Sequence, residues 1–288
     1  MVDDELRKIG FFDGWAKQSI REKFGIDVFR ITRKNESYVG KFFSDEQLHG
    51  RQEINYYTML RAIGVPTLEV KASTNCLLLL EDITTSAVYR LGIESDVNDV
   101  SIARLIGDWF KLLHTRGKTY EGLTKLNLLD NVVDELSHSK VVTAIEKSGT
   151  AENPFWNMLI NNMDKIKRAY LGLCNTITYN DFWWDNLAVA KDLSSIIMFD
   201  YNCVYRKYAY ADIRHIPSVL SKDAGVAFLE AYGKYDEAEK IFEDLYFPLS
   251  GLISAFNMDA FPTWANKFLD LFHSGELMQR MNKFENNF

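Results

Sequence analysis

Two short apolar runs in the second half of the chain are each joined to polar residues at fixed spacing. Asp181 lies five positions before Asn186, which leads into the run 187–189, and Asp200 follows the run 196–199 directly. Both runs predict short strands, so the two aspartates and the asparagine are expected on neighbouring loops. Phosphoryl transfer requires one carboxylate to receive the proton of an attacking hydroxyl, and an amide and a carboxylate to hold Mg²⁺ on the phosphates. We therefore expect Asp181 to be catalytic, and Asn186 and Asp200 to bind the metal.

A lysine and a glutamate near the N-terminus fit the same chemistry. The segments 27–32 and 38–43 are β-prone and flank a short polar turn, which predicts a hairpin with Lys41 on its second strand. Glu53 follows twelve positions later, inside a helix predicted for 47–63. A carboxylate there can pair with Lys41 and aim it at phosphate oxygens. The alternative is a surface lysine on a half-exposed strand and a solvated helix glutamate.

The character of the chain changes near residue 83. Before this point a helix and two further strands are predicted, over 1–24, 68–70 and 76–80. Beyond it helices are predicted over 100–115, 126–147, 153–173 and from about 217 to the end. The pattern predicts a small strand-rich domain, 1–83, followed by a larger and mainly helical domain, 84–288.

At this boundary the apolar run 77–80 leads into Glu81, Asp82 and Ile83. Backbone groups of these three residues are well placed to bind the adenine edge of a nucleotide. The alternative is a buried strand with a polar exit turn. No G-x-x-x-x-G-K-[ST] motif occurs, and the hairpin turn lacks glycine, so we expect the turn 34–37 to cover the phosphates with polar side chains and backbone N–H groups.

Composition excludes several other classes of protein. The net charge of −7 argues against a nucleic-acid binder, which normally presents a basic face. No stretch approaches the ~20 apolar residues of a membrane span, and the acidic N-terminus has no apolar run of signal-peptide length. Three widely spaced cysteines favour a reduced protein. These features together predict a cytoplasmic location.

Taken in order, these residues resemble the aminoglycoside phosphotransferase and choline kinase-like family of small-molecule kinases. The resemblance covers nearly the whole chain, from Lys41 and Glu53 through 79–82 to the loop 181–186 and Asp200. It implies an α+β, protein-kinase-like bilobal fold, with a small N-lobe built on an antiparallel sheet and a larger, mainly helical C-lobe. It also implies ATP or GTP as co-substrate, Mg²⁺ as cofactor, and a small-molecule hydroxyl as phosphate acceptor.

The resemblance extends to supporting residues and has one departure. Asp212 matches an acid that supports the catalytic loop in this family, while His114 and Asp185 are expected to be structural. The family's loop normally reads His-Gly-Asp, whereas Tyr179 and Asn180 precede Asp181 here. We expect Tyr179 to brace the loop through its hydroxyl or by packing. Asn180 is expected in an unusual backbone conformation, which asparagine tolerates better than most residues.

Two groups of residues bear on the acceptor. An acidic group would suit a polyamine such as an aminoglycoside, although a solvated helix face explains it as well: Asp223, Glu230, Asp236, Glu237, Glu239, Glu243 and Asp244. An aromatic group near the loop would suit the quaternary ammonium of choline, although core packing explains it too: Phe182, Trp183, Trp184, Tyr201, Tyr205, Tyr208 and Tyr210. The leading hypothesis is an aminoglycoside phosphotransferase-like enzyme. The alternatives are a kinase of choline, ethanolamine or another amino alcohol, and a nucleotide-binding pseudokinase that acts as a regulatory module.

Overall fold

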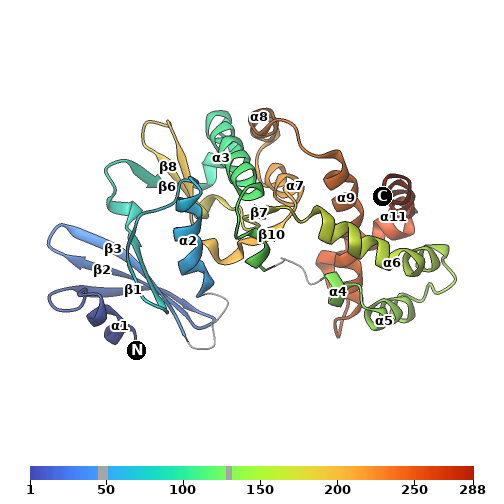
Figure 1. Ribbon diagram of the computed structural model, residues 1–288, viewed down its shortest axis with the longest axis horizontal. Helices are drawn as coiled ribbons and strands as arrows, with labels where there is room; N and C mark the ends of the chain where they lie inside the picture. The colour runs from blue at the N-terminus through green and yellow to red at the C-terminus, as the bar shows by residue number, and fades with distance from the viewer. Residues whose placement is uncertain (45–50, 128–131) are drawn as a thin grey trace. The chain divides into compact units, whose positions relative to one another are not determined.

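The computed structural model describes residues 1–44, 51–127 and 132–288, and these form two compact units (Figure 1). The first unit contains the segments 1–121, 177–205 and 212–233. The second unit contains the segments 122–176, 206–211 and 234–288. The N-terminal antiparallel sheet and the mainly helical remainder confirm the predicted fold class. The division into domains 1–83 and 84–288 stays a prediction.

The first unit carries a five-stranded antiparallel sheet in the order β1-β2-β3-β5-β4, and a smaller three-stranded sheet in the order β6-β8-β9. Its strands are β1 (Ala16–Lys23), β2 (Ile26–Arg33), β3 (Glu36–Phe43), β4 (Val70–Ser73), β5 (Leu77–Glu81), β6 (Tyr89–Leu91), β8 (Leu187–Ala190) and β9 (Ile196–Met198). Its helices are α1 (Val2–Lys8), α2 (Gln52–Ala62), α3 (Val100–Lys118) and α8 (Lys222–Tyr232). The chain passes between the units at β7 (Thr176–Thr178), β10 (Tyr205–Lys207) and α7 (Tyr210–Val219).

The larger sheet separates a packed face from a face that lines the cavities described below. Because successive side chains of a strand point to opposite faces, alternate residues of β2, β3 and β5 share one side. One side forms a core with α1, made of Leu6, Phe29, Ile31, Phe42, Leu77 and Leu79. Gly40 lies under the Phe29 ring, where a Cβ would come within 2.4 Å of a ring carbon. The opposite side carries Val39 and Lys41.

The predicted helix over 1–24 is wrong in its second half. Helix α1 ends at Lys8, and β1 occupies 16–23 as the outer strand of the sheet. All eight side chains of β1 are exposed. The strand therefore has no buried face, and neither an alternating nor a helical pattern of apolar residues could predict its conformation. Backbone pairing with β2 decides the structure of this segment.

The other predicted elements of this unit are confirmed with shifted ends. The hairpin forms from β2 and β3, and the amphipathic helix forms as α3. The predicted helix over 47–63 forms as α2 over 52–62, while its residues before 51 lie outside the described part of the chain. Helices α3 and α8 pack closely, with Gly107 of α3 approaching the Phe228 backbone of α8.

The second unit is a helical assembly around α9. It contains α4 (Val132–Glu135), α5 (His138–Ser148), α6 (Pro154–Leu173), α9 (Glu237–Phe256), α10 (Asn266–His273) and α11 (Glu276–Asn287). Its core gathers apolar side chains from all six helices. The predicted helix over 126–147 is divided between α4 and α5, and its residues 128–131 lie outside the described part. None of the described helices has both the length and the apolar character that crossing a membrane would require.

Candidate active site

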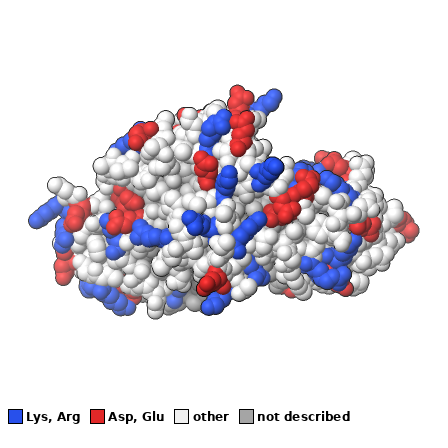
Figure 2. Space-filling view, turned by 45° about the horizontal axis from the view of Figure 1, so that its top comes forward, with Lys and Arg blue, Asp and Glu red and all other residues white. Residues whose placement is uncertain are grey.

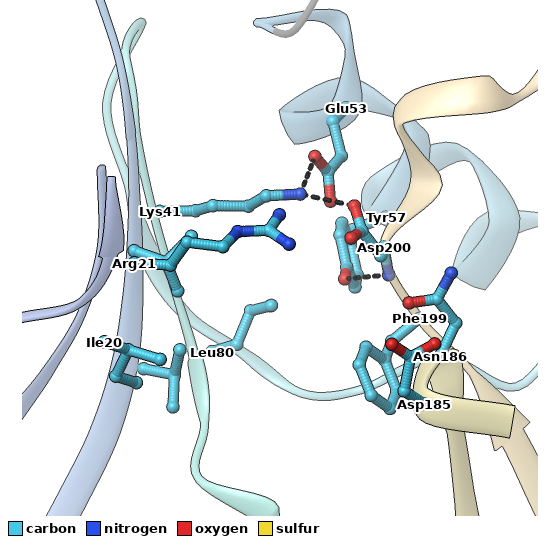
Figure 3. Close-up of a pocket in the computed structure, with 12 residues that line it drawn as sticks. Ile20, Arg21, Lys41, Glu53, Tyr57, Leu80, Asp185, Asn186, Phe199 and Asp200 are labelled. Atoms are coloured by element: carbon cyan, nitrogen blue, oxygen red, sulfur yellow. Dashed lines mark hydrogen bonds and ion pairs between the residues drawn. The ribbon is translucent and has the colours of Figure 1, made fainter. Parts of the chain in front are cut away.

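Lys41 lies between two carboxylates at the centre of the site (Figure 3). Its Nζ is 2.5 Å from Oε2 of Glu53 and 2.5 Å from Oδ1 of Asp200. Glu53 is fully buried on α2, and its other oxygen accepts a hydrogen bond of 3.2 Å from the Tyr201 backbone N–H. The pairing of Lys41 with Glu53 confirms the geometry expected from their spacing, and it ties β3, α2 and the end of β9 together.

Burial and charge oppose each other in this cluster. Burial alone would lower the pKa of Lys41, but the carboxylates of Glu53 and Asp200 outweigh it and raise that pKa, so the lysine stays charged. Burial raises the pKa of Glu53 to about 7, although the Lys41 charge works in the opposite direction. The Asp200 side chain is 22% exposed, so one of its faces remains open to a ligand.

The β8–β9 ladder brings Asn186 beside Asp200. Leu187 pairs with Met198, and the Phe199 N–H donates to the Asn186 carbonyl at 3.1 Å. Asn186 Nδ2 donates to Asp181, at 3.2 Å to Oδ2 and 3.1 Å to the backbone oxygen. The three residues expected from their spacing therefore lie in one contiguous group.

The carboxyl of Asp181 binds its proton more tightly than an ordinary aspartate does. Burial, followed by the nearby negative charge of Asp200, raises its pKa above the ordinary aspartate value, while the bond from Asn186 opposes this shift. A general base works best when its pKa approaches the working pH. The direction of the shift therefore suits acceptance of a proton.

A buried acid holds the loop that carries Asp181. Asp212 accepts hydrogen bonds of 2.8 Å from the backbone N–H groups of both Tyr179 and Asn180. His114 Nε2 lies 3.0 Å from the same carboxylate, and its Nδ1 lies 2.9 Å from the Tyr232 hydroxyl. This chain links α3, α7 and α8 to the loop, so Asp212 and His114 have the supporting positions expected of them.

Tyr179 and Asn180 fit their positions in the way the sequence predicted. The buried Tyr179 hydroxyl donates to the Phe199 carbonyl, immediately before Asp200. Asn180 adopts a left-handed conformation with φ of 64°. Its Nδ2 donates to Thr178 Oγ1 at 2.9 Å and to the Cys203 carbonyl at 3.0 Å, so its side chain fixes the turn.

Two adjoining cavities of about 290 Å³ each run along the inner face of the larger sheet. The first is lined by Ile20, Arg21, Val28, Val39, Lys41, Glu53, Tyr57, Leu80, Asp185, Asn186, Phe199 and Asp200. The second is lined by Arg30, Leu68, Glu81, Asp82, Ile83, Thr84 and Leu91, and it shares Ile20, Val28, Val39, Leu80, Asp185 and Phe199 with the first. We call the two together the cleft. Asp181 lines neither cavity and lies beside them, bonded to Asn186.

Glu81, Asp82 and Ile83 line the second cavity but not the first, which holds Lys41. The Asp82 carboxylate is fully engaged, accepting bonds of 2.6 Å from Arg30 Nε and 2.6 Å from Ser37 Oγ. Burial would raise the pKa of Asp82, but Arg30, Ser37 and Thr84 outweigh it and lower that pKa. Asp82 thus fixes the shape of this end of the cleft.

The expectation that the turn 34–37 covers the phosphates is wrong. Ser37 is bonded to Asp82, at the opposite end of β3 from Lys41, and no residue of this turn lines the cleft. Ile20 and Arg21 of β1 line the cleft instead. Neither residue was expected here, because residues 1–24 were predicted to form a helix.

Asp185 was expected to be a structural loop acid, yet it lines both cavities with Asn186 beside it. Figure 3 shows the Asp185 and Asn186 side chains together on the side of the first cavity away from Arg21. The position of Asp185 directly before Asn186 is the feature of the sequence that could have indicated this.

The acidic group does not form a single solvated face. Glu239 and Glu243 are buried in the second unit, where they accept bonds from the Tyr210 N–H and the Tyr208 hydroxyl. Glu230 pairs with Arg104 at 2.8 Å in the first unit. On the face shown in Figure 2, acidic side chains stand among basic ones. Structural roles therefore account for a large part of this group.

The aromatic group is mostly core. Phe182, Tyr201 and Tyr208 are buried, and Tyr210 packs against Tyr235 with ring centroids 4.9 Å apart. Trp183 differs, because 46% of it is exposed while it stands two positions after Asp181. Its ring is the most exposed of this group.

Comparison of the sequence with protein-family models and with curated proteins finds no match. Comparison with solved structures does. The fold is similar to that of choline kinase from Streptococcus pneumoniae, with a TM-score of 0.56 and 13% identity over 96% of this chain and 97% of that chain. It is also similar to macrolide 2'-phosphotransferase from Brachybacterium faecium, with a TM-score of 0.56 and 12% identity over 98% of this chain and 96% of that one.

A third similar structure is the ternary complex of streptomycin, ATP and APH(2'')-IIa. Its TM-score is 0.54, with 14% identity over 93% of both chains. At this level of identity the likeness establishes the fold, and it does so along almost the full length of each protein. The chain therefore has the fold of the small-molecule kinases that its sequence resembles.

Proposed function

We propose that this protein is a Mg²⁺- and nucleotide-dependent phosphotransferase that acts on a hydroxyl group of a small molecule. One observation carries the proposal: Lys41, held by Glu53 and Asp200, stands at one end of a cleft whose other end is the segment 81–83. A nucleoside triphosphate needs this order of groups, with a cation for its phosphates and an apolar slot bordered by backbone groups for its base. A solved structure with this fold contains ATP together with streptomycin, which supports the same interpretation.

In this proposal each group of the site has a separate task. Lys41 contacts the α- and β-phosphates, and Glu53 keeps it aimed. Asp181, outside the cleft and next to Asn186, orients the acceptor hydroxyl and takes its proton. Asp212 and His114 keep the loop in place, so the catalysis rests on positioning and charge neutralisation.

The chemistry of the donor set suits Mg²⁺. Asp200 offers a carboxylate oxygen beside the one bound by Lys41. Asn186 has its Nδ2 turned to Asp181, which leaves its amide oxygen for a ligand, and Figure 3 shows that oxygen on the side of Asp200. Mg²⁺ in kinase sites is held by one or two such oxygen ligands together with substrate phosphates, and it neutralises the charge that develops on them.

For the acceptor, an aminoglycoside-like molecule leads and a choline-like amino alcohol is the alternative. The solved structures with this fold include kinases named for both kinds of acceptor. The acidic group gives less support to a polyamine than the sequence suggested, whereas the exposed Trp183 offers an aromatic face for a cationic acceptor. ATP or GTP serves as donor, and the enzyme acts in the cytoplasm.

The test is phosphate transfer from Mg-ATP or Mg-GTP to a panel of aminoglycosides and amino alcohols, with the product identified by mass spectrometry. The wild-type protein should phosphorylate one acceptor class. Asp181→Asn should lower kcat by roughly 10²–10⁴-fold, the usual contribution of a general base. Asp192→Asn is the matched control, since Asp192 is an exposed turn aspartate bonded to Ser194, and it should leave kcat unchanged. Full activity in Asp181→Asn would refute the assignment, and nucleotide binding without transfer to any acceptor would favour the pseudokinase.

A further inference from the structure

The outer strand β1 contributes a cation to the cleft through an irregularity in its pairing. Ser19 pairs with Phe29 and Arg21 pairs with Val28, so Ile20 is an extra residue in the ladder. A bulge of this kind redirects side chains next to active sites. Two consecutive residues of β1, Ile20 and Arg21, consequently line the same cavity, although regular alternation would send them to opposite faces.

Arg21 also differs from Lys41, the other basic side chain of that cavity, in its contacts. The basic side chains of its lining are Arg21 and Lys41, and the carboxylic side chains are Glu53, Asp185 and Asp200. Lys41 is already bonded to two of these acids at 2.5 Å. Among the described residues Arg21 forms no ion pair or hydrogen bond through its side chain, and Figure 3 shows its guanidinium projecting from β1 into the cavity.

The neighbouring turn between β1 and β2 has few backbone N–H groups that could bind phosphate in place of Arg21. The β1–β2 connection consists of Phe24 and Gly25 alone, both with positive φ, as in a tight hairpin turn. A glycine-rich loop that could cradle phosphates with many backbone N–H groups is thus missing from this hairpin. An anion that enters the first cavity therefore meets Asp185, Asp200 and a Lys41 already held between two carboxyl groups, and Arg21 is the available cation of the described lining.

We propose that Arg21 binds the phosphate groups of the nucleotide from the β1 side of the cleft, opposite Asp185 and Asn186. The proposal rests on the function proposed above and adds to it a phosphate-binding residue. Arginine suits the role because its planar guanidinium binds phosphate oxygens in pairs, and it stays charged at all working pH values. Ile20, one position earlier and shared by both cavities, would then cover the base or ribose.

The test compares ligands that differ only in their phosphates. Binding of ATP, ADP and adenosine, and of GTP, GDP and guanosine, is measured by calorimetry with Mg²⁺ for wild type, Arg21→Gln and Arg21→Lys. Arg21→Gln should weaken triphosphate binding about tenfold or more and leave nucleoside binding unchanged. Arg21→Lys should lie between the two, since it keeps the charge and loses the paired contact.

Lys17→Gln is the matched control. Lys17 lies on the same strand, outside the cleft, and pairs with Asp3, so removal of its charge should not change binding. If wild type and Arg21→Gln bind triphosphates equally, the role of Arg21 is refuted while the proposed function stands. If wild-type protein binds no nucleotide, both are refuted. An equal loss of nucleoside and triphosphate affinity in Arg21→Gln would show a general disturbance of the cleft and would also refute the specific role.

Discussion

Asn180 and Asp200 hold the two least ordinary backbone positions of the site. Their φ angles are 64° and 63°, in the left-handed region that most residues avoid. Asparagine and aspartate are the non-glycine residues that enter it most readily. At Asn180 two side-chain bonds secure the conformation, and at Asp200 the N–H is bonded to the Tyr57 hydroxyl at 3.3 Å. Strain of this kind is typical of functional sites, because the surrounding structure must hold it in place.

The ionised Asp181 side chain should cost folding stability. Its pKa is raised in the folded protein by burial and by Asp200, so the folded state binds the proton more tightly than the unfolded state does. The ionised form is therefore destabilising at pH values above the folded pKa. The penalty disappears as the pH falls below the ordinary aspartate range, where the group is protonated in both states.

Asp181→Asn should accordingly raise the free energy of unfolding at pH 7, and the gain should shrink toward zero near pH 3. Urea unfolding of both proteins across this pH range measures the difference. Asp192→Asn again serves as control, with no such gain at pH 7, because bonds from Ser194 lower the pKa of Asp192. A destabilised Asp181→Asn at pH 7 would contradict the expected sign. A gain in stability with a loss of activity would be the usual trade-off of a catalytic group.

At the scale of elements, the hairpin of β2 and β3 positions Lys41 by packing its other face. Gly40 and Phe29 are ladder partners, and the Phe29 ring covers the glycine so closely that a Cβ would approach to 2.4 Å. The ring in turn packs in the core against α1. A change at Gly40 should therefore act on Lys41, its immediate neighbour, through the strand.

Gly40→Ala should lower the free energy of unfolding by about 1–3 kcal/mol, the usual cost of overpacking a core. In a Phe29→Leu background the added methyl gains room, so the same substitution should cost less. A double-mutant cycle by denaturant unfolding measures this coupling. Additive effects of the two substitutions would show that the ring is not what excludes the methyl group. Gly172→Ala, on α6 with nothing within 4 Å of its Cβ position, is the control for the substitution itself.

At the scale of the whole molecule, the sequence predicted what depends on spacing along regular elements. The pairing of Lys41 with Glu53 followed from a strand lysine and a helix glutamate, and the grouping of Asp181, Asn186 and Asp200 followed from two short strands. A chain with 12–14% identity to the solved structures compared above keeps their fold along nearly its whole length. These features could be predicted from the sequence because the periodicity of strands and helices encodes them.

What the sequence did not predict depends on contacts between distant segments. Strand β1 is exposed on both faces, so no apolar pattern marked it, and Arg21 was missed with it. The turn 34–37 was assigned to the phosphates because β1 was not predicted, so the hairpin of β2 and β3 was taken as the first hairpin of the sheet. Glu239 and Glu243 resemble solvated helix acids in sequence, and only the tyrosines and backbone groups around them show that they are buried.

The most direct test of the kinase account is the Mg²⁺ dependence of nucleotide binding, measured by calorimetry with ATP and GTP for wild type, Asp181→Asn and Asp200→Ala. Wild type should bind one of the nucleotides more tightly with Mg²⁺ than without it. Asp181→Asn should bind almost equally well, since Asp181 lies outside the cleft, whereas Asp200→Ala should lose most of the Mg²⁺-dependent gain. Absence of Mg-nucleotide binding to the wild-type protein, or a Mg²⁺ effect that survives in Asp200→Ala, would contradict the account.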